Sequence, residues 1–325
     1  MRTLLAITLF AFGSAANAQT IPPDDAIRVA EFYRLAPQTE DRIWPNWSKV
    51  ADPLLLITPD AEFLTHFPTP PADFKPANDG FVTRPRQFPT ALQATFPAFG
   101  PPAVIAIGEP TNTASNTSTP WEIVVMHEHF HQLQNAQPGY FEAVAALNLS
   151  RGDKTGMWML NYAFPYTDPA VDERFAALRD QLLLTLDTPK GKTFHAAAKR
   201  YLAMRHDFFA QLAPDDAKYL RFQLWQEGIA RYTQIAAAEA ASGYQPTEAY
   251  QHLPDYTPFS GDASKLRAQT LEELRTVNLA KSRRNAVYSF GAVEGLLLDR
   301  LNPKWKSEYF QHMLTTDPLF EASTP

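Results

Sequence analysis

The spacing of apolar residues changes near Pro120, and this change constrains the fold more than any other feature of the chain. Residues 19 to about 120 are rich in Pro and turn-forming residues. They carry apolar runs at 54–57, 88–96 and 103–107 and a short amphipathic stretch at 25–35. Beyond Pro120, apolar residues recur every three or four positions, as they do along one face of a helix. The sequence therefore predicts a small sheet with long connections, followed by a mainly helical region.

Helical spacing extends over most of the second region. We expect helices at residues 121–134, 171–186, 193–212, 215–241, 263–280 and 284–301. The segments 112–119 and 242–258 are rich in Ser, Thr, Asn, Pro and Tyr, so we expect them to be loops.

The composition is that of an ordinary globular protein. The 325 residues carry a formal net charge of -6 and are 45% hydrophobic. This is too hydrophobic for a disordered chain, and the acidic balance opposes binding to nucleic acid or to an anionic membrane surface. Because the chain has no Cys, disulfides, a thiol nucleophile and thiolate metal sites are excluded. Any metal site must use His and carboxylate ligands.

The first 18 residues have the three-part form of a secretory signal peptide. Arg2 precedes an apolar stretch at 4–12, and small residues follow, ending in Ala16-Asn17-Ala18. A short buried helix is the alternative interpretation. No later stretch has the unbroken apolar length of a membrane span. We expect cleavage before Gln19 and an exported protein without a membrane anchor, periplasmic or secreted.

The stretch from Thr119 to His131 carries the most specific motif. Thr119 and Glu122 have the spacing of a capping box, with Pro120 at the first helical position, so a helix is predicted to begin here and to run through three histidines. On such a helix His127 and His131 share a face.

Two imidazoles four residues apart can converge on one tetrahedral cation, and Glu128 lies beside them. The pattern His127-Glu128-x-x-His131 is the one that zinc metalloproteases use. A helix with a solvated cluster of histidines is the alternative. His129 points away from the pair, so a structural or surface role is expected for it.

A catalytic zinc needs a third protein ligand, and Glu227 is the best candidate. It lies in a helical stretch between Trp225 and Ile229, where apolar neighbours suggest burial, and a buried carboxylate needs a partner such as a metal. The adjacent Gly228 would leave room for close packing of another element.

Together, His127-Glu128-x-x-His131 and Glu227-Gly228-x-Ala230 resemble the gluzincins, the thermolysin-like zinc peptidases of the peptidase MA-like group. The resemblance covers these two short motifs. It implies that Glu227 is the third zinc ligand. Thermolysin-type members have an Asp four residues beyond that ligand to orient a zinc His, whereas this chain has Arg231. The acceptor that orients the zinc histidines is therefore unassigned.

The resemblance also implies roles for other residues. Zinc would activate a water, and Glu128 would act as general base. Gluzincins use a Tyr or His after the third ligand to stabilise the oxyanion. Tyr288 is the first choice for this role, although a Tyr in an apolar helix is often a core residue. Poorer alternatives are Tyr232, Tyr162 and Tyr166.

Two further segments have two interpretations each. Gluzincins pair an edge strand near the zinc helix with the substrate main chain, and the run at 103–108 is a candidate for it. That run is equally consistent with an ordinary buried strand. Lys281, Arg283 and Arg284 can attract a substrate carboxylate, but such a run is usually a solvated face.

These observations predict an α+β protein. A signal peptide (1–18) would precede a small N-terminal subdomain with a mixed sheet (19–120). The zinc helix would follow, in a mainly helical metallopeptidase subdomain that carries the ligands (121–325). The predicted function is zinc-dependent (Zn2+) hydrolysis of peptide bonds in a peptide or protein substrate. The alternatives are a zinc hydrolase of a non-peptide amide, or a non-catalytic binding protein on a peptidase fold. The sequence does not indicate an oligomeric state.

Overall fold

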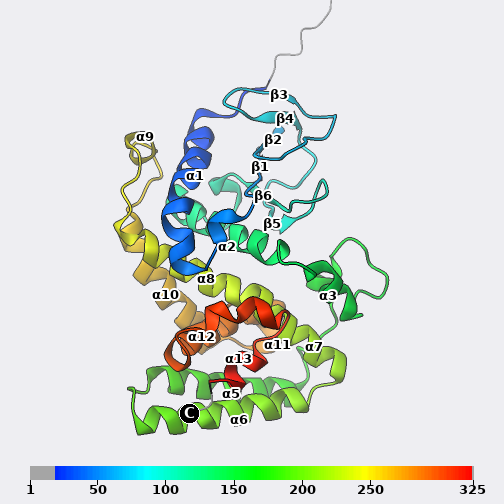
Figure 1. Cartoon of the computed structure of the whole chain (residues 1–325), viewed down its shortest axis with the longest axis vertical. Coiled ribbons are helices and arrows are strands. Elements are labelled where there is room, and N and C mark those ends of the chain that lie inside the picture. The colour runs from blue at the N-terminus through cyan, green and yellow to red at the C-terminus, as the bar shows by residue number, and fades with distance from the viewer. Residues whose placement is uncertain (1–18, 324–325) are drawn as a thin grey trace, which may run out of the picture.

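The computed structural model describes residues 19–323, so the expected signal peptide at 1–18 lies outside the described residues. The chain folds as a mixed α+β protein, mainly helical, with one six-stranded sheet. Figure 1 shows the sheet at one end of the molecule, α1 (Pro23–Ile43) beside it, and the long helices of the second half stacked away from it. Within residues 19–323, no helix has both the length and the apolar character to cross a bilayer.

The sheet is mixed, as predicted. Its strand order is β3-β4-β2-β1-β6-β5, and only β1 and β6 pair in parallel. The strands are β1 (Leu54–Ile57), β2 (Ala61–Thr65), β3 (Lys75–Pro76), β4 (Val82–Pro85), β5 (Gln93–Phe96) and β6 (Val104–Gly108). The run at 103–108 is therefore an interior strand, which confirms its interpretation as an ordinary buried strand and rules it out as the edge strand. The edge on that side is β5.

Helices form where the periodicity predicts them, with small shifts in their ends, but the expected loop at 242–258 also contains a short helix at Glu248–Gln251. The later helices are α2 (Ser118–Asn135), α3 (Tyr140–Ala146), α4 (Trp158–Asn161), α5 (Pro169–Asp187), α6 (Lys192–Ala210), α7 (Pro214–Gln223), α8 (Ile229–Ala240), α9 (Glu248–Gln251), α10 (Phe259–Thr276), α11 (Leu279–Ser282), α12 (Ala286–Leu301) and α13 (Asp317–Glu321). The first helix, α1, is longer than expected and continues through Pro37.

The start of α2 differs from the prediction. The helix begins at Ser118, one residue before the predicted cap, and no side chain caps it. Thr119 instead donates its hydroxyl hydrogen bond to the Thr257 carbonyl. Glu122 is fully buried and its carboxyl oxygens have no hydrogen-bond partner among the described residues. The capping-box prediction is wrong because the segment around Thr257 covers this end of the helix and supplies other contacts.

The helix that carries Glu227 contains one wider turn. Between α7 and α8 the chain forms a π-helical turn, η3 (Leu224–Gly228), without breaking the helix. Helix α12 packs against this turn. The two backbones come closest at two glycines, since a Cβ on Gly228 would lie 2.6 Å from the Cα of Gly291. Gly228 thus permits the close packing that the sequence suggested.

The glycine contact leads to a stability prediction. We expect Gly291→Ala to lower the free energy of unfolding by about 1–3 kcal/mol, because a methyl group 2.5 Å from the Cα of Gly228 overpacks the helix contact. Gly261→Ala is the control, since Gly261 lies in α10 with no atom within 4 Å of the added Cβ. The control should be neutral or slightly stabilising. Urea unfolding of both variants measures the difference, and equal stability would contradict the inferred contact.

Candidate metal centre

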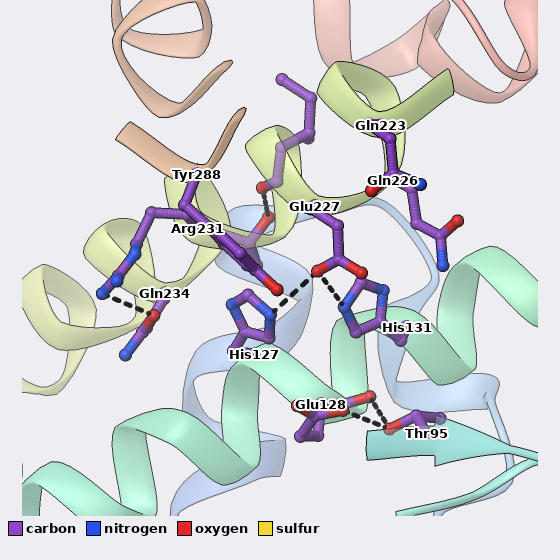
Figure 2. Close-up of polar contacts among 12 residues, drawn as sticks. Thr95, His127, Glu128, His131, Gln223, Gln226, Glu227, Arg231, Gln234 and Tyr288 are labelled. Atoms are coloured by element: carbon purple, nitrogen blue, oxygen red, sulfur yellow. Dashed lines mark hydrogen bonds and ion pairs between the residues drawn. The ribbon is translucent and has the colours of Figure 1, made fainter. Parts of the chain in front are cut away.

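The helix α2 presents two histidines on one buried face, as its spacing predicted. His127 and His131 are 7% and 5% exposed, and their ring centroids lie 4.9 Å apart. Their Nε2 atoms point away from the helix axis toward the same side chain (Figure 2).

That side chain is Glu227, from the wider turn η3. Its Oε2 atom lies 3.3 Å from Nε2 of His131 and 3.8 Å from Nε2 of His127. A tetrahedral metal bound at about 2.0–2.1 Å separates its ligands by roughly 3.3–3.4 Å. The three donor atoms lie within 4.8 Å of one another, so this buried group can hold a metal ion. The structure thus brings together the three residues that the sequence indicated as ligands.

The three side chains shift one another's pKa values. Burial opposes a charge on His131, but the Glu227 carboxylate outweighs this effect and raises the His131 pKa to about 9. Burial likewise disfavours the Glu227 carboxylate, yet His131 and Arg284 hold the Glu227 pKa well below its usual range. Since metal ligation needs neutral imidazoles, a metal at this site competes with the proton on His131.

A glutamine side chain orients one of the two histidines. Nδ1 of His131 lies 2.7 Å from Oε1 of Gln134, which fixes the ring with Nε2 toward Glu227. Nδ1 of His127 is buried and has no hydrogen-bond partner among residues 19–323. Gln134 is not among the residues expected from the sequence, although its position three residues after His131 on the same helix places the two side chains together.

The second oxygen of Glu227 is held by Arg284, which enters from η5 (Arg283–Asn285), just before α12. Nη2 of Arg284 donates to Oε1 of Glu227 at 2.7 Å, Nε donates to Gln223 at 2.8 Å, and Nη1 donates to the Tyr288 hydroxyl at 3.1 Å. For Arg284, the expectation of a solvated face is therefore wrong. Because α12 packs closely on η3, the arginine turns inward and leaves Oε2 of Glu227 for a metal.

The candidate general base is held by the edge of the sheet. The Thr95 hydroxyl, on β5, lies 2.8 Å from a carboxylate oxygen of Glu128 and 2.9 Å from its backbone carbonyl (Figure 2). The hydroxyl can donate to one of these oxygens at a time. No local signal pointed to Thr95, because it lies far from Glu128 in the sequence.

His129 has the structural role expected for it. Its ring is buried, with Nε2 2.9 Å from Oε1 of Glu40 on α1 and Nδ1 2.7 Å from Oε1 of Gln132. It therefore ties α2 to α1 and takes no part in the His127 and His131 pair.

Tyr288 lies at the site, and the alternative tyrosines do not. Its ring centroid is 6.3 Å from that of His127, on the side of the site where Arg231 also lies (Figure 2). Tyr232 donates to Asp299, Tyr162 donates to Asp216, and Tyr166 faces Tyr219. Since the Tyr288 hydroxyl accepts from Arg284, its own proton remains free to be donated.

No protein-family model, curated protein or solved structure matches this chain. The resemblance to gluzincins therefore depends on the two short motifs alone. Any function must be argued from the arrangement of these side chains.

Proposed function

We propose that this protein is an exported zinc-dependent metallopeptidase. One observation carries the proposal: two imidazoles and a carboxylate converge on one point, and a further carboxylate, Glu128, lines a pocket together with His127. A site that only stored a metal would have no need of this second carboxylate.

Zinc is the metal that this donor set fits best. Two histidines and one glutamate are a common set of protein ligands for catalytic zinc, and the set leaves one position of a tetrahedron open. Oxygen-only sites suit magnesium or calcium, and thiolates, which this chain lacks, suit other centres. A hydrogen bond with Gln134 orients the His131 ring, and a hydrogen bond from Arg284 orients the Glu227 carboxylate.

The chain's own residues supply the remaining parts of hydrolysis. A zinc ion held by His127, His131 and Glu227 would act as a Lewis acid, which would lower the pKa of a bound water and polarise the substrate carbonyl. Glu128 accepts the proton of the attacking water and returns it to the leaving amine nitrogen. Thr95 keeps the Glu128 carboxylate oriented. Tyr288 donates its hydroxyl proton in a hydrogen bond to the developing oxyanion, and Arg284 polarises that hydroxyl.

The edge strand favours a peptide over another amide. Within the described sheet, β5 has a neighbour on one side only. Gln93 on this strand lines the pocket, and the Thr95 hydroxyl donates a hydrogen bond to Glu128. A peptide that adds a strand to this edge would run its main chain past the metal site. A small non-peptide amide would make no use of this edge.

We further propose that the sheet region (19–120) and the helical region (121–325) act as two subdomains, with the pocket where they meet. The pocket is lined from β5, α2, α8, α10 and α12, which supports this division. Export follows from the signal-like first 18 residues, and the mature protein would act in the periplasm or outside the cell.

The proposal is tested by metal analysis and hydrolysis on one preparation of the protein. We expect about one zinc per chain and cleavage of a mixture of internally quenched peptides. A chelator should abolish the cleavage, and added zinc should restore it. Zinc without peptide cleavage, but with hydrolysis of small amides, would favour the alternative amide hydrolase. Zinc without any hydrolysis would favour a non-catalytic binding protein, and absence of zinc would contradict the site itself.

A further inference from the structure

The pocket beside the metal site continues well beyond the ligands. It has a volume of about 490 Å³, within the usual range for small-molecule sites. From His127 it extends along the N-terminal half of α2 to a wall made by α8 and α10. The polar side chains of that wall are Arg231, Gln234, Asp262, Lys265 and Gln269.

Arg231 is the partly buried cation of this wall, whereas Lys265 is exposed. Its side chain is 23% exposed and its one ion pair is loose, with Nη2 3.9 Å from a carboxylate oxygen of Glu273, which is itself 52% exposed. Nη1 donates to Gln234 at a long 3.3 Å. Nε is buried without a hydrogen-bond partner among residues 19–323. A buried guanidinium N–H normally has a partner, so this arrangement suits a ligand with acceptor atoms.

The orientation of Arg231 places it near the reacting centre. Its guanidinium carbon lies 5.9 Å from the centroid of the Tyr288 ring. In Figure 2 Arg231 and Tyr288 lie side by side, on the opposite side of the site from Gln226. Arg231 also occupies the position where thermolysin-type sequences have an Asp, and no hydrogen bond links it to His127. Its charge is therefore directed to the pocket.

Arg231 determines the net charge of this wall, because the charges of Lys265 and Asp262 offset each other. Lys265 and Asp262 lie one helical turn apart on α10, and the Lys265 charge acts on Asp262. Burial raises the pKa of Asp262, and the Lys265 charge lowers it. Arg284, the other nearby cation, is committed to Glu227. Arg231 and Lys265 against Asp262 leave this wall with one formal positive charge; Lys265 is exposed and Arg231 is partly buried.

From these contacts we propose that Arg231 binds a carboxylate of the substrate, a specificity that rests on the proposed function of the same site. The carboxylate belongs either to an acidic side chain of the peptide or to its free C-terminus. The planar guanidinium can meet both carboxylate oxygens through two N–H groups, which gives a directional bond that a lysine cannot copy.

Binding is measured first, on zinc-loaded Glu128→Gln protein, so that no turnover is required. Four labelled peptides of one sequence are compared by fluorescence anisotropy. They have Glu or Gln at one position and a free or amidated C-terminus. We expect a peptide with the recognised carboxylate to bind at least about tenfold more tightly than its neutral match. The position of that carboxylate identifies its source.

Arg231→Gln in the same background should abolish this preference and leave the affinity for the neutral peptide unchanged. Arg231→Lys should restore part of it. Arg267→Gln is the matched control, because Arg267 is a cation on α10 that pairs with Glu239 and is not among the residues that line the pocket. An unchanged preference in Arg231→Gln, an equal loss in Arg267→Gln, or no peptide binding at all would overturn the proposal.

Hydrolysis by the wild-type protein separates this proposal from the proposed function. Cleavage of neutral peptides with no carboxylate preference would support a peptidase and overturn the role of Arg231. A preference that depends on Arg231 in binding, without cleavage of any peptide, would support the carboxylate site and overturn the peptidase.

Discussion

Replacing Glu128 by Gln is expected to leave zinc bound and to lower kcat about 1,000-fold. The amide has the shape of the carboxylate and can still accept the Thr95 hydrogen bond, but it cannot take a proton from water. Zinc content and peptide hydrolysis measured on the same preparation test both halves of this expectation.

Thr95→Val provides the comparison for this prediction. It removes the hydroxyl that orients Glu128 but keeps the base, so its effect on kcat should be clearly smaller than that of Glu128→Gln. If Glu128→Gln kept more than a tenth of the wild-type kcat, Glu128 would not be the general base.

The second large effect is expected for the third ligand. Glu227→Gln should weaken zinc binding at least about 100-fold, because loss of a residue that only supports a ligand already weakens binding 10–100-fold. His131→Ala should act in the same direction. Competition with a chromophoric chelator gives the affinities, and His252→Ala, at an exposed position outside the site, is the control.

The choice of Gln at this position matters because Glu227 also pairs with Arg284. Glu227→Ala would leave the Arg284 charge partly buried and unpaired, which destabilises a fold by several kcal/mol. The double variant Glu227→Ala with Arg284→Met removes both charges and separates loss of metal from loss of stability. Wild-type zinc affinity in Glu227→Gln would show that Glu227 is not a ligand.

Periodicity and motif spacing predicted the parts of the site that depend on one helix. His127 and His131 had to share a face once α2 formed, and Glu128 had to lie beside them. Glu227 was identified because a buried carboxylate in an apolar helix needs a partner, and the structure places it beside both imidazoles.

Apart from Gln134, which lies on α2 itself, the parts that were missed come from elements distant in sequence. Thr95 reaches Glu128 because β5 pairs at the edge of the sheet, and Arg284 reaches Glu227 because α12 packs on η3. No local pattern determines such contacts. Strand β2 was missed for a similar reason: its buried Glu62 interrupts the apolar pattern and is neutralised by Arg84 on the neighbouring strand, 2.7 Å away.

The wider turn η3 has a consequence for how this protein can tolerate insertions and deletions. A π turn holds one residue more than an α turn, so it shifts the angular phase between α7 and α8 by about 100°. Deleting one residue from 224–228 would replace the π turn by an uninterrupted α-helix. The helix surface that follows the deleted residue would then be rotated by about 100° relative to the surface that precedes it. Either the buried face of α8 would turn out of the core, or the Glu227 carboxylate would turn away from the two histidines. The extra residue of the π turn is therefore needed for both contacts at once.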